Sequence, residues 1–161
     1  MAHVLSMDVD VEYPDIYGVI SDLPSYKMCA QISRFLRLEL VHEDALLNTP
    51  PPITEIVAGE MITYEKFIWA DAEAEAFFYL INNQVEVVGA SPVPEENTLF
   101  QEEETHKNTH FLLPEWKQVS YLIHTEGLEN MIEIEQLKDV RGIRFVMKQA
   151  INRFKNYSKL L

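Results

Sequence analysis

The run "MITYEKFIWADAEAEAFFYLIN", residues 61–82, constrains the fold of this chain more than any other stretch. Residues 61–70 and 74–82 are both rich in β-branched and aromatic side chains, which favour β-strands. Only "DAE" separates the two segments, and so short a link joins antiparallel strands, because a parallel crossover needs about a dozen residues or more. The run therefore predicts a β-hairpin, and with it an antiparallel sheet.

Two segments near the N-terminus also predict strands. Residues 7–13, "MDVDVEY", alternate apolar with acidic side chains, which is the period of a half-buried strand with one wet face. Pro14 interrupts the alternation, and residues 15–21, "DIYGVIS", form a second apolar run. We interpret this run as a continuation of the strand after a bend at the proline.

Residues 21–40, "SDLPSYKMCAQISRFLRLEL", change to helical spacing. One face of this segment carries its apolar side chains, which are Met28, Cys29, Ile32, Phe35 and Leu36. Ser21 or Asp22 can cap the helix, and Pro24 is tolerated in its first turn. The pattern predicts an amphipathic helix with Cys29 as a buried, inert thiol, followed by a short strand at residues 38–42.

Beyond the predicted hairpin, residues 83–109 are polar and acidic and contain two prolines. We interpret them as a mobile acidic loop within a single domain that spans residues 1–161. Residues 120–126, "SYLIHTE", then predict a strand. The spacing of Met131 and its apolar neighbours predicts a helix that ends at Gly142.

The last part of the chain fits two patterns. Residues 143–156 fit either a strand to about Met147 followed by a short helix, or one helix, and we favour the first. A strand, helix, strand order would form a βαβ unit in the C-terminal third, which resembles those of ferredoxin-like regulatory domains. The predicted fold class is α+β, a mostly antiparallel sheet with helices packed on one side.

Composition excludes several classes of protein. The formal net charge of −13 disfavours binding to nucleic acid, and a single cysteine excludes a disulfide framework. No apolar run reaches the roughly 20 residues that cross a bilayer, and the N-terminus lacks a secretory pattern. We therefore expect a cytoplasmic protein without a membrane partner.

Charge is unevenly distributed along the chain. Residues 1–137 hold 25 acids and 6 bases, whereas residues 138–161 hold 7 bases and one acid, Asp139. The basic segment could pack beside the acidic body of its own chain, which is the usual outcome for charge runs. Alternatively, it could contact an acidic partner such as a second copy of the chain.

Two segments, "DIYGVISDLPSYKMCAQISRFLRLEL" and "LLPEWKQVSYLI", resemble signatures of the IPExxxVDY family of small bacterial proteins. Leu113, Pro114 and Glu115 occupy the Ile-Pro-Glu positions of the family motif, and its Val and Tyr correspond to Val119 and Tyr121. Ser120 stands where the family has Asp, which argues against acid chemistry at that position. The resemblance covers 38 of 161 residues and implies a small cytoplasmic domain without an established activity.

The candidate site residues come from the same motif. Glu115 beside Trp116 and Tyr121 could bind a ligand, but we favour a Pro-Glu turn that leads into the next strand. His106 and His110 are weak candidates for metal ligands, because a His-x3-His pair serves zinc when it lies on a helix. We expect no metal, no cofactor and no catalytic residue.

Three hypotheses for function remain. The first is a non-catalytic interaction domain that acts as a homodimer or binds another protein. The second is a regulatory domain that senses a small ligand. The third is a small enzyme that uses Glu115 with His124, although alternation along the strand predicts that His124 faces away from Tyr121.

Overall fold

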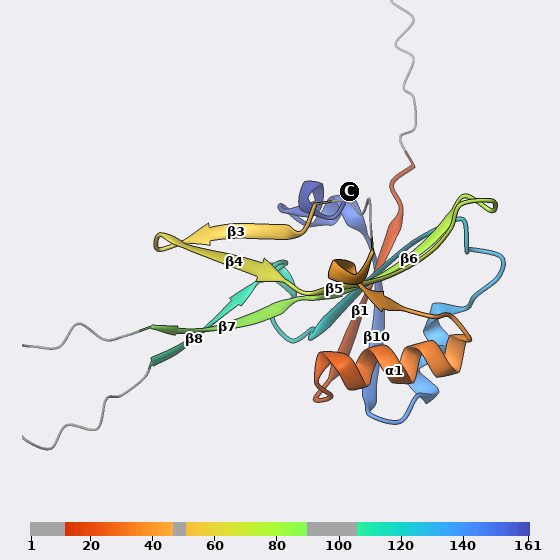
Figure 1. Ribbon diagram of the computed structural model, residues 1–161, viewed down its shortest axis with the longest axis horizontal. Helices are drawn as coiled ribbons and strands as arrows, with labels where there is room; N and C mark the ends of the chain where they lie inside the picture. The colour runs from red at the N-terminus through yellow and green to blue at the C-terminus, as the bar shows by residue number, and fades with distance from the viewer. Residues whose placement is uncertain (1–11, 47–50, 90–105) are drawn as a thin grey trace, which may run out of the picture.

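The computed structural model describes residues 12–46, 51–89 and 106–161, and a six-stranded antiparallel sheet forms its centre (Figure 1). The strand order is β10-β1-β9-β6-β5-β2. These strands are β1 (Asp15–Ser21), β2 (Val41–His42), β5 (Lys66–Asp71), β6 (Ala76–Asn82), β9 (Tyr121–Glu126) and β10 (Ile143–Ala150). The prediction of a mostly antiparallel sheet is confirmed.

The predicted hairpin is present, but its first segment is divided. Strands β5 and β6 pair from Lys66↔Ile81 to Asp71↔Ala76. Residues 61–64 instead belong to β4 (Glu60–Tyr64), which pairs with β3 (Ile53–Val57) in a separate two-stranded sheet. Residues 61–64 and 66–70 both have high strand propensity, so composition does not reveal that the run passes from one sheet to the other at Glu65.

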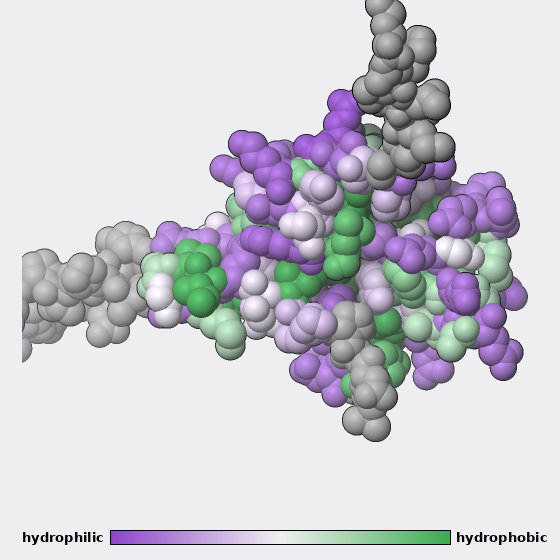
Figure 2. Space-filling model, turned by 90° about the horizontal axis from the view of Figure 1, so that it is seen from above, coloured by the Kyte–Doolittle hydropathy of each residue, from purple (hydrophilic) through white to green (hydrophobic). Residues whose placement is uncertain are grey.

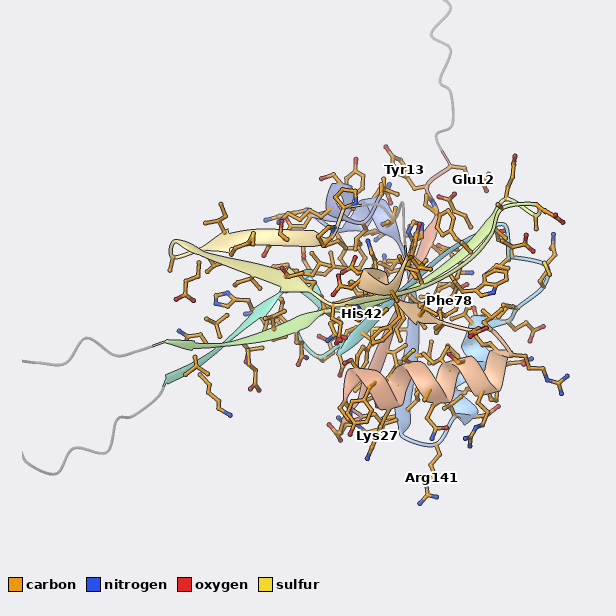
Figure 3. All side chains as sticks on the ribbon, in the orientation of Figure 1. Glu12, Tyr13, Lys27, His42, Phe78 and Arg141 are labelled. Carbon is orange, nitrogen blue, oxygen red and sulfur yellow. The ribbon has the colours of Figure 1, made fainter. Side chains whose placement is uncertain are left out.

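Helix α1 (Ser25–Leu36) covers one face of the sheet, as Figures 1 and 3 show. Alternation along the strands directs Val19, Phe78 and Ile123 to this face, where they pack with Met28 and other buried residues of α1. The predicted cap is wrong: Pro24 holds the N-cap position, and no side chain caps the helix. Ser21 does not cap α1, because its hydroxyl donates to the Gly142 carbonyl oxygen at 2.6 Å.

A second layer covers the opposite face. It consists of the β3–β4 hairpin and three short 3-10 helices, namely η2 (Pro114–Trp116), η4 (Ile151–Arg153) and η5 (Tyr157–Lys159). The buried residues between this layer and the sheet include Ile16, Tyr64, Ile81, Leu122 and Phe154. We call this layer the roof, because the candidate site described below lies between it and the sheet.

The C-terminal third differs from the prediction. The predicted helix is a 3-10 helix, η3 (Ile134–Asp139), and β10 continues to Ala150 before the turn η4. Pairing of Asp15 with Ala150 extends the strand, because the backbone groups of β10 find partners along the whole of β1. Strands β9 and β10 both run antiparallel to β1, which lies between them.

The segment predicted as a loop contains two strands. Strand β7 (Gln84–Gly89) pairs with β8 (His106–Phe111), and residues 90–105 lie outside the described part of the chain. The surrounding polar and acidic residues concealed this hairpin, although Val85 and Val87 alternate with Glu86 in β7 and pack against the core. Most of the predicted strand at residues 7–13 also lies outside the described residues, and Glu12 and Tyr13 are not in a strand.

Candidate functional site

The Pro-Glu turn is a structural element that leads from β8 to β9. Its η2 helix contains Glu115, whose side chain is exposed. The Glu115 carboxylate accepts a hydrogen bond from the Lys155 backbone N–H at 3.0 Å, and this bond holds the pKa of the carboxyl below its usual value. Glu115 therefore ties the turn to the C-terminal segment.

Trp116 packs into the roof. Its ring lies against Phe154, with the ring centroids 4.6 Å apart. A Cβ placed on Gly18 of β1 would come within 2.7 Å of the Trp116 ring. Glycine is therefore required at this close approach between the roof and the sheet.

Asn83, between β6 and β7, organises the turn and was missed by sequence reasoning. Its side chain is fully buried. The Asn83 amide donates to the carbonyl oxygens of Trp116 at 3.0 Å and Val119 at 2.9 Å, and it accepts from the Leu113 N–H at 2.8 Å. An asparagine in a polar stretch gives no sequence signal for this role.

Tyr121 lies on the face of the sheet that α1 covers, away from Trp116. Its hydroxyl donates to the Leu23 carbonyl oxygen. Burial, with a smaller contribution from Glu65, raises the pKa of Tyr121 to about 12. The structure does not bring Glu115, Trp116 and Tyr121 into one pocket, because the sheet lies between them.

Tyr121 instead lines a polar depression of about 380 Å³ near the end of β1. Most of its polar groups already have partners in the protein. Ser120 Oγ donates to the Ser21 carbonyl oxygen at 2.7 Å, and Arg144 pairs with Asp22 at 2.9 Å. Asn82 also lines the depression, and its buried Oδ1 has no hydrogen-bond partner in the described part of the chain. The depression is largely satisfied by its own residues and leaves little for a ligand.

A second cavity, of about 540 Å³, lies between the sheet and the roof. We call it the His124 cavity. Its sheet side is lined by Lys66, Phe77, Tyr79, Ile81, His124 and Glu126. Its roof side is lined by residues 51–54, at the start of β3, and residues 159–161. A size of several hundred cubic ångströms and a mixture of aromatic and polar walls are typical of small-ligand sites.

His124 is the unusual residue of this cavity. The residue is only 1% exposed, and neither ring nitrogen has a hydrogen-bond partner among the described residues. Burial lowers the pKa of His124, while the charge of Glu126 and an interaction with the Leu160 backbone act in the opposite direction; the Leu160 interaction does not meet the geometry of a hydrogen bond. The imidazole is therefore neutral near pH 7, with one nitrogen able to donate and the other able to accept.

Lys66 adds a buried cation to the same cavity. Its side chain is 5% exposed, and its Nζ lies 3.5 Å from Glu43 Oε2. That Glu43 oxygen has no hydrogen bond in the described part of the structure, so the pair is loose. The Lys66 Nζ also lies 5.6 Å from the centroid of the Tyr79 ring. A lysine inside the apolar run of residues 61–70 is the sequence signal that could have identified this site.

Phe77, Tyr79 and His124 form an aromatic floor. The Phe77 and Tyr79 centroids are 4.5 Å apart, and the His124 ring meets Phe77 edge-on at 5.7 Å. Register explains the grouping, because Tyr79 pairs directly with His124 across β6 and β9. His124 therefore faces away from Tyr121, as predicted, and Glu115 does not line the cavity that His124 lines.

The weak metal candidates occupy a strand. His106 and His110 both lie in β8, where positions four residues apart are separated by about 13 Å. Two imidazoles bind one zinc ion only when both nitrogens lie about 2 Å from it. Within residues 12–46, 51–89 and 106–161, no group of three or more His, Cys, Asp or Glu side chains is placed to hold a metal ion.

Comparisons with known proteins give no assignment for this chain. Among the described helices, none has the length and apolar character needed to cross a bilayer. No protein-family model, curated protein or solved structure matches this chain.

Proposed function

We propose that this protein is a non-catalytic domain that binds a small ligand in the His124 cavity and senses it. The single observation that carries the proposal is the unpartnered imidazole of His124 in a cavity of about 540 Å³. Buried polar groups are almost always hydrogen bonded, so a buried side chain without a partner needs an explanation, and a ligand in the adjoining cavity supplies one.

The sheet topology supports the same proposal. Strands β1 and β6 run in the same direction on either side of β9, and β9 and β10 do so on either side of β1. Such split arrangements support the resemblance to ferredoxin-like regulatory domains, although fold likeness alone does not assign function. Membership of the IPExxxVDY family remains a proposal that rests on the "LLPEWKQVSY" motif.

A thermal-shift screen of metabolites tests the proposal. At least one compound class should raise the melting temperature of the wild-type protein, because binding to the native state stabilises it. The shift should disappear in His124→Phe and persist in Gln118→Ala, a change in the polar depression. The proposal fails if no compound produces a shift, or if the shifts are equal in both variants.

A second candidate function, homodimerisation, is favoured by the outer face of the β3–β4 hairpin. Ile56 and Met61 pair directly across the two strands and are 80% and 73% exposed. The neighbouring pair on this face, Thr54 and Thr63, is also uncharged and exposed. Figure 2 shows hydrophobic surface gathered at the outer end of the arm that this hairpin forms.

An uncharged face is where two copies of a strongly acidic protein could approach each other. The net charge of −13 opposes contact elsewhere on the surface. The basic segment is less suitable for a partner, because Arg144, Lys148 and Lys159 pair with Asp22, Asp15 and Glu55 of the same chain. These intrachain pairs support the interpretation that the segment packs beside the acidic body.

Light scattering after size-exclusion chromatography, at low and high salt, tests the second candidate. We expect a dimer at both salt concentrations, because the contact is apolar. An Ile56→Thr, Met61→Thr double variant should be monomeric, whereas Met131→Thr, which alters another exposed apolar residue, should not change the mass. A wild-type monomer at both salt concentrations would contradict homodimerisation.

A further inference from the structure

We propose that the His124 cavity selects a planar aromatic carboxylate, with the ring on Phe77 and Tyr79 and the carboxylate beside Lys66. This inference rests on the proposed ligand-binding function and specifies the chemistry of the ligand. It follows from three properties of the cavity: its unused hydrogen-bond donors, its aromatic floor, and the balance of charge around Lys66.

Three side chains on the sheet side of the cavity have donors available to a ligand, namely Lys66, Tyr79 and His124. The Lys66 ammonium has three donors, and the Glu43 carboxylate at 3.5 Å is its one ionic partner in the described structure. Burial together with Glu126 raises the pKa of Tyr79, so its hydroxyl keeps its proton and can donate. Neutral His124 contributes one donor and one acceptor. An acceptor-rich group such as a carboxylate is complementary to this set.

The floor of the cavity is suited to a planar ring. Phe77 and Tyr79 are partly exposed and tilted by 36° to each other, and Ile81 continues the apolar surface. Aromatic rings in offset or edge-on contact attract each other beyond the effect of apolar area burial, so an aromatic ring should bind here more tightly than a saturated ring of equal size. Residues 51–53, at the start of β3, provide an apolar wall opposite the floor.

Charge around the cavity limits a bound anion to a single negative charge. Lys159 pairs with Glu55 in the roof, so Lys66 is the cation available to a ligand. Glu43 and Glu126 lie close enough to oppose a doubly charged group such as phosphate. A positively charged ligand would instead meet the Lys66 ammonium directly. A monocarboxylate is the anion that this arrangement accepts.

Isothermal titration calorimetry with matched probes tests the proposal on the intact chain. The probes are benzoate, benzamide and benzylammonium, the three naphthalene analogues, and cyclohexanecarboxylate. We expect the aromatic carboxylates to bind at least about tenfold more tightly than the amide or ammonium of the same ring, since hydrogen bonds to charged groups are the stronger ones. Cyclohexanecarboxylate should bind less tightly than benzoate.

Variants locate the binding site. Tyr79→Phe removes one donor and keeps the ring, so carboxylate affinity should fall several-fold. The double variant Glu43→Met, Lys66→Met removes the ammonium without leaving a buried carboxylate unpaired, and carboxylate affinity should fall at least about tenfold. Gln118→Ala should bind as the wild type does. Circular dichroism melts confirm that each variant is folded.

The outcomes separate this inference from the proposed function. If amides or ammonium compounds bind as tightly as carboxylates, and His124→Phe abolishes that binding, the ligand class is wrong but the cavity is a binding site. If carboxylates bind equally well to the folded Glu43→Met, Lys66→Met variant, the inference is wrong because the ammonium is not used. If no probe binds and the metabolite screen is also negative, both proposals fail.

Discussion

Asn83 and His124 are both buried polar side chains, yet they differ completely in how their polar atoms are used. Asn83 makes three hydrogen bonds that hold the Pro-Glu turn against the sheet. His124 makes none among the described residues, although it is only 1% exposed. The difference teaches that burial alone does not define a structural residue, because a satisfied group stabilises the fold and an unsatisfied one costs stability. We interpret the first as structural and the second as functional.

The largest effect should follow the loss of Asn83. Asn83→Ala leaves the buried Leu113 N–H without a partner and removes one of two hydrogen bonds from each of the Trp116 and Val119 carbonyl oxygens, so we expect about 4 kcal/mol less unfolding free energy. Asn82→Ala, a neighbouring change that removes one long bond to Glu65 at 3.4 Å, should cost much less. Urea denaturation measures both, and equal losses would contradict the structural role of Asn83.

Lys66 is intermediate between Asn83 and His124, because its ammonium has one partner, the Glu43 carboxylate at 3.5 Å. Lys66→Met leaves the Glu43 carboxylate buried without a cation, and we expect a loss of about 3 kcal/mol. The Glu43→Met, Lys66→Met double variant should recover most of this loss, because paired buried charges contribute little net stability. The same denaturation measurement checks both, and a double variant as unstable as the single one would show that the pair itself is stabilising.

His124 should respond in the opposite direction to Asn83. In ligand-free protein at pH 7.5, His124→Phe removes two unsatisfied polar atoms from a buried aromatic cluster. We expect the unfolding free energy to rise by about 1 kcal/mol. Loss of stability in ligand-free His124→Phe would mean that the imidazole is satisfied in solution, and the comparison with Asn83 would fail.

The pH dependence of stability provides a second test of the role of His124. The native pKa of His124 is lowered, so the unfolded chain takes up a proton first as the pH falls below the ordinary value of 6.5. The stability associated with neutral His124 is therefore complete above about pH 6.5 and decreases below it until the native pKa is reached. Thermal melts between pH 7.5 and 5 should show a decrease in wild type that is smaller in His124→Phe. Parallel curves for the two proteins would exclude His124 as the titrating group.

Glu115 should give the smallest effect. Glu115→Gln removes an exposed charge that accepts one backbone hydrogen bond, and we expect a loss of no more than about 0.5 kcal/mol at neutral pH. Because the native pKa of Glu115 is lowered, this contribution is present above its ordinary pKa and is lost as the pH falls through the native value. A loss as large as that of Asn83→Ala would give Glu115 a role that its exposed position does not explain.

Local patterns predicted several elements correctly. Strand propensity on both sides of "DAE" predicted the β5–β6 hairpin, and helical spacing predicted α1. Alternation placed His124 and Tyr121 on opposite faces of β9. The candidate site was predicted only in part, because His124 was considered as a partner of Glu115, whereas Lys66 and Tyr79 are its neighbours in the cavity.

The sequence by itself determined that the chain would form short antiparallel strands with one amphipathic helix, because these follow from residues close together along the chain. Only the tertiary structure decided which strands pair beyond the β5–β6 hairpin, where residues 61–70 divide, and that Glu43 and Lys66 meet. It also decided that the side chain of Asn83 is hydrogen bonded and that of His124 is not. The physical reason is that a hydrogen bond or an ion pair needs two partners, and the second partner here comes from a distant part of the chain.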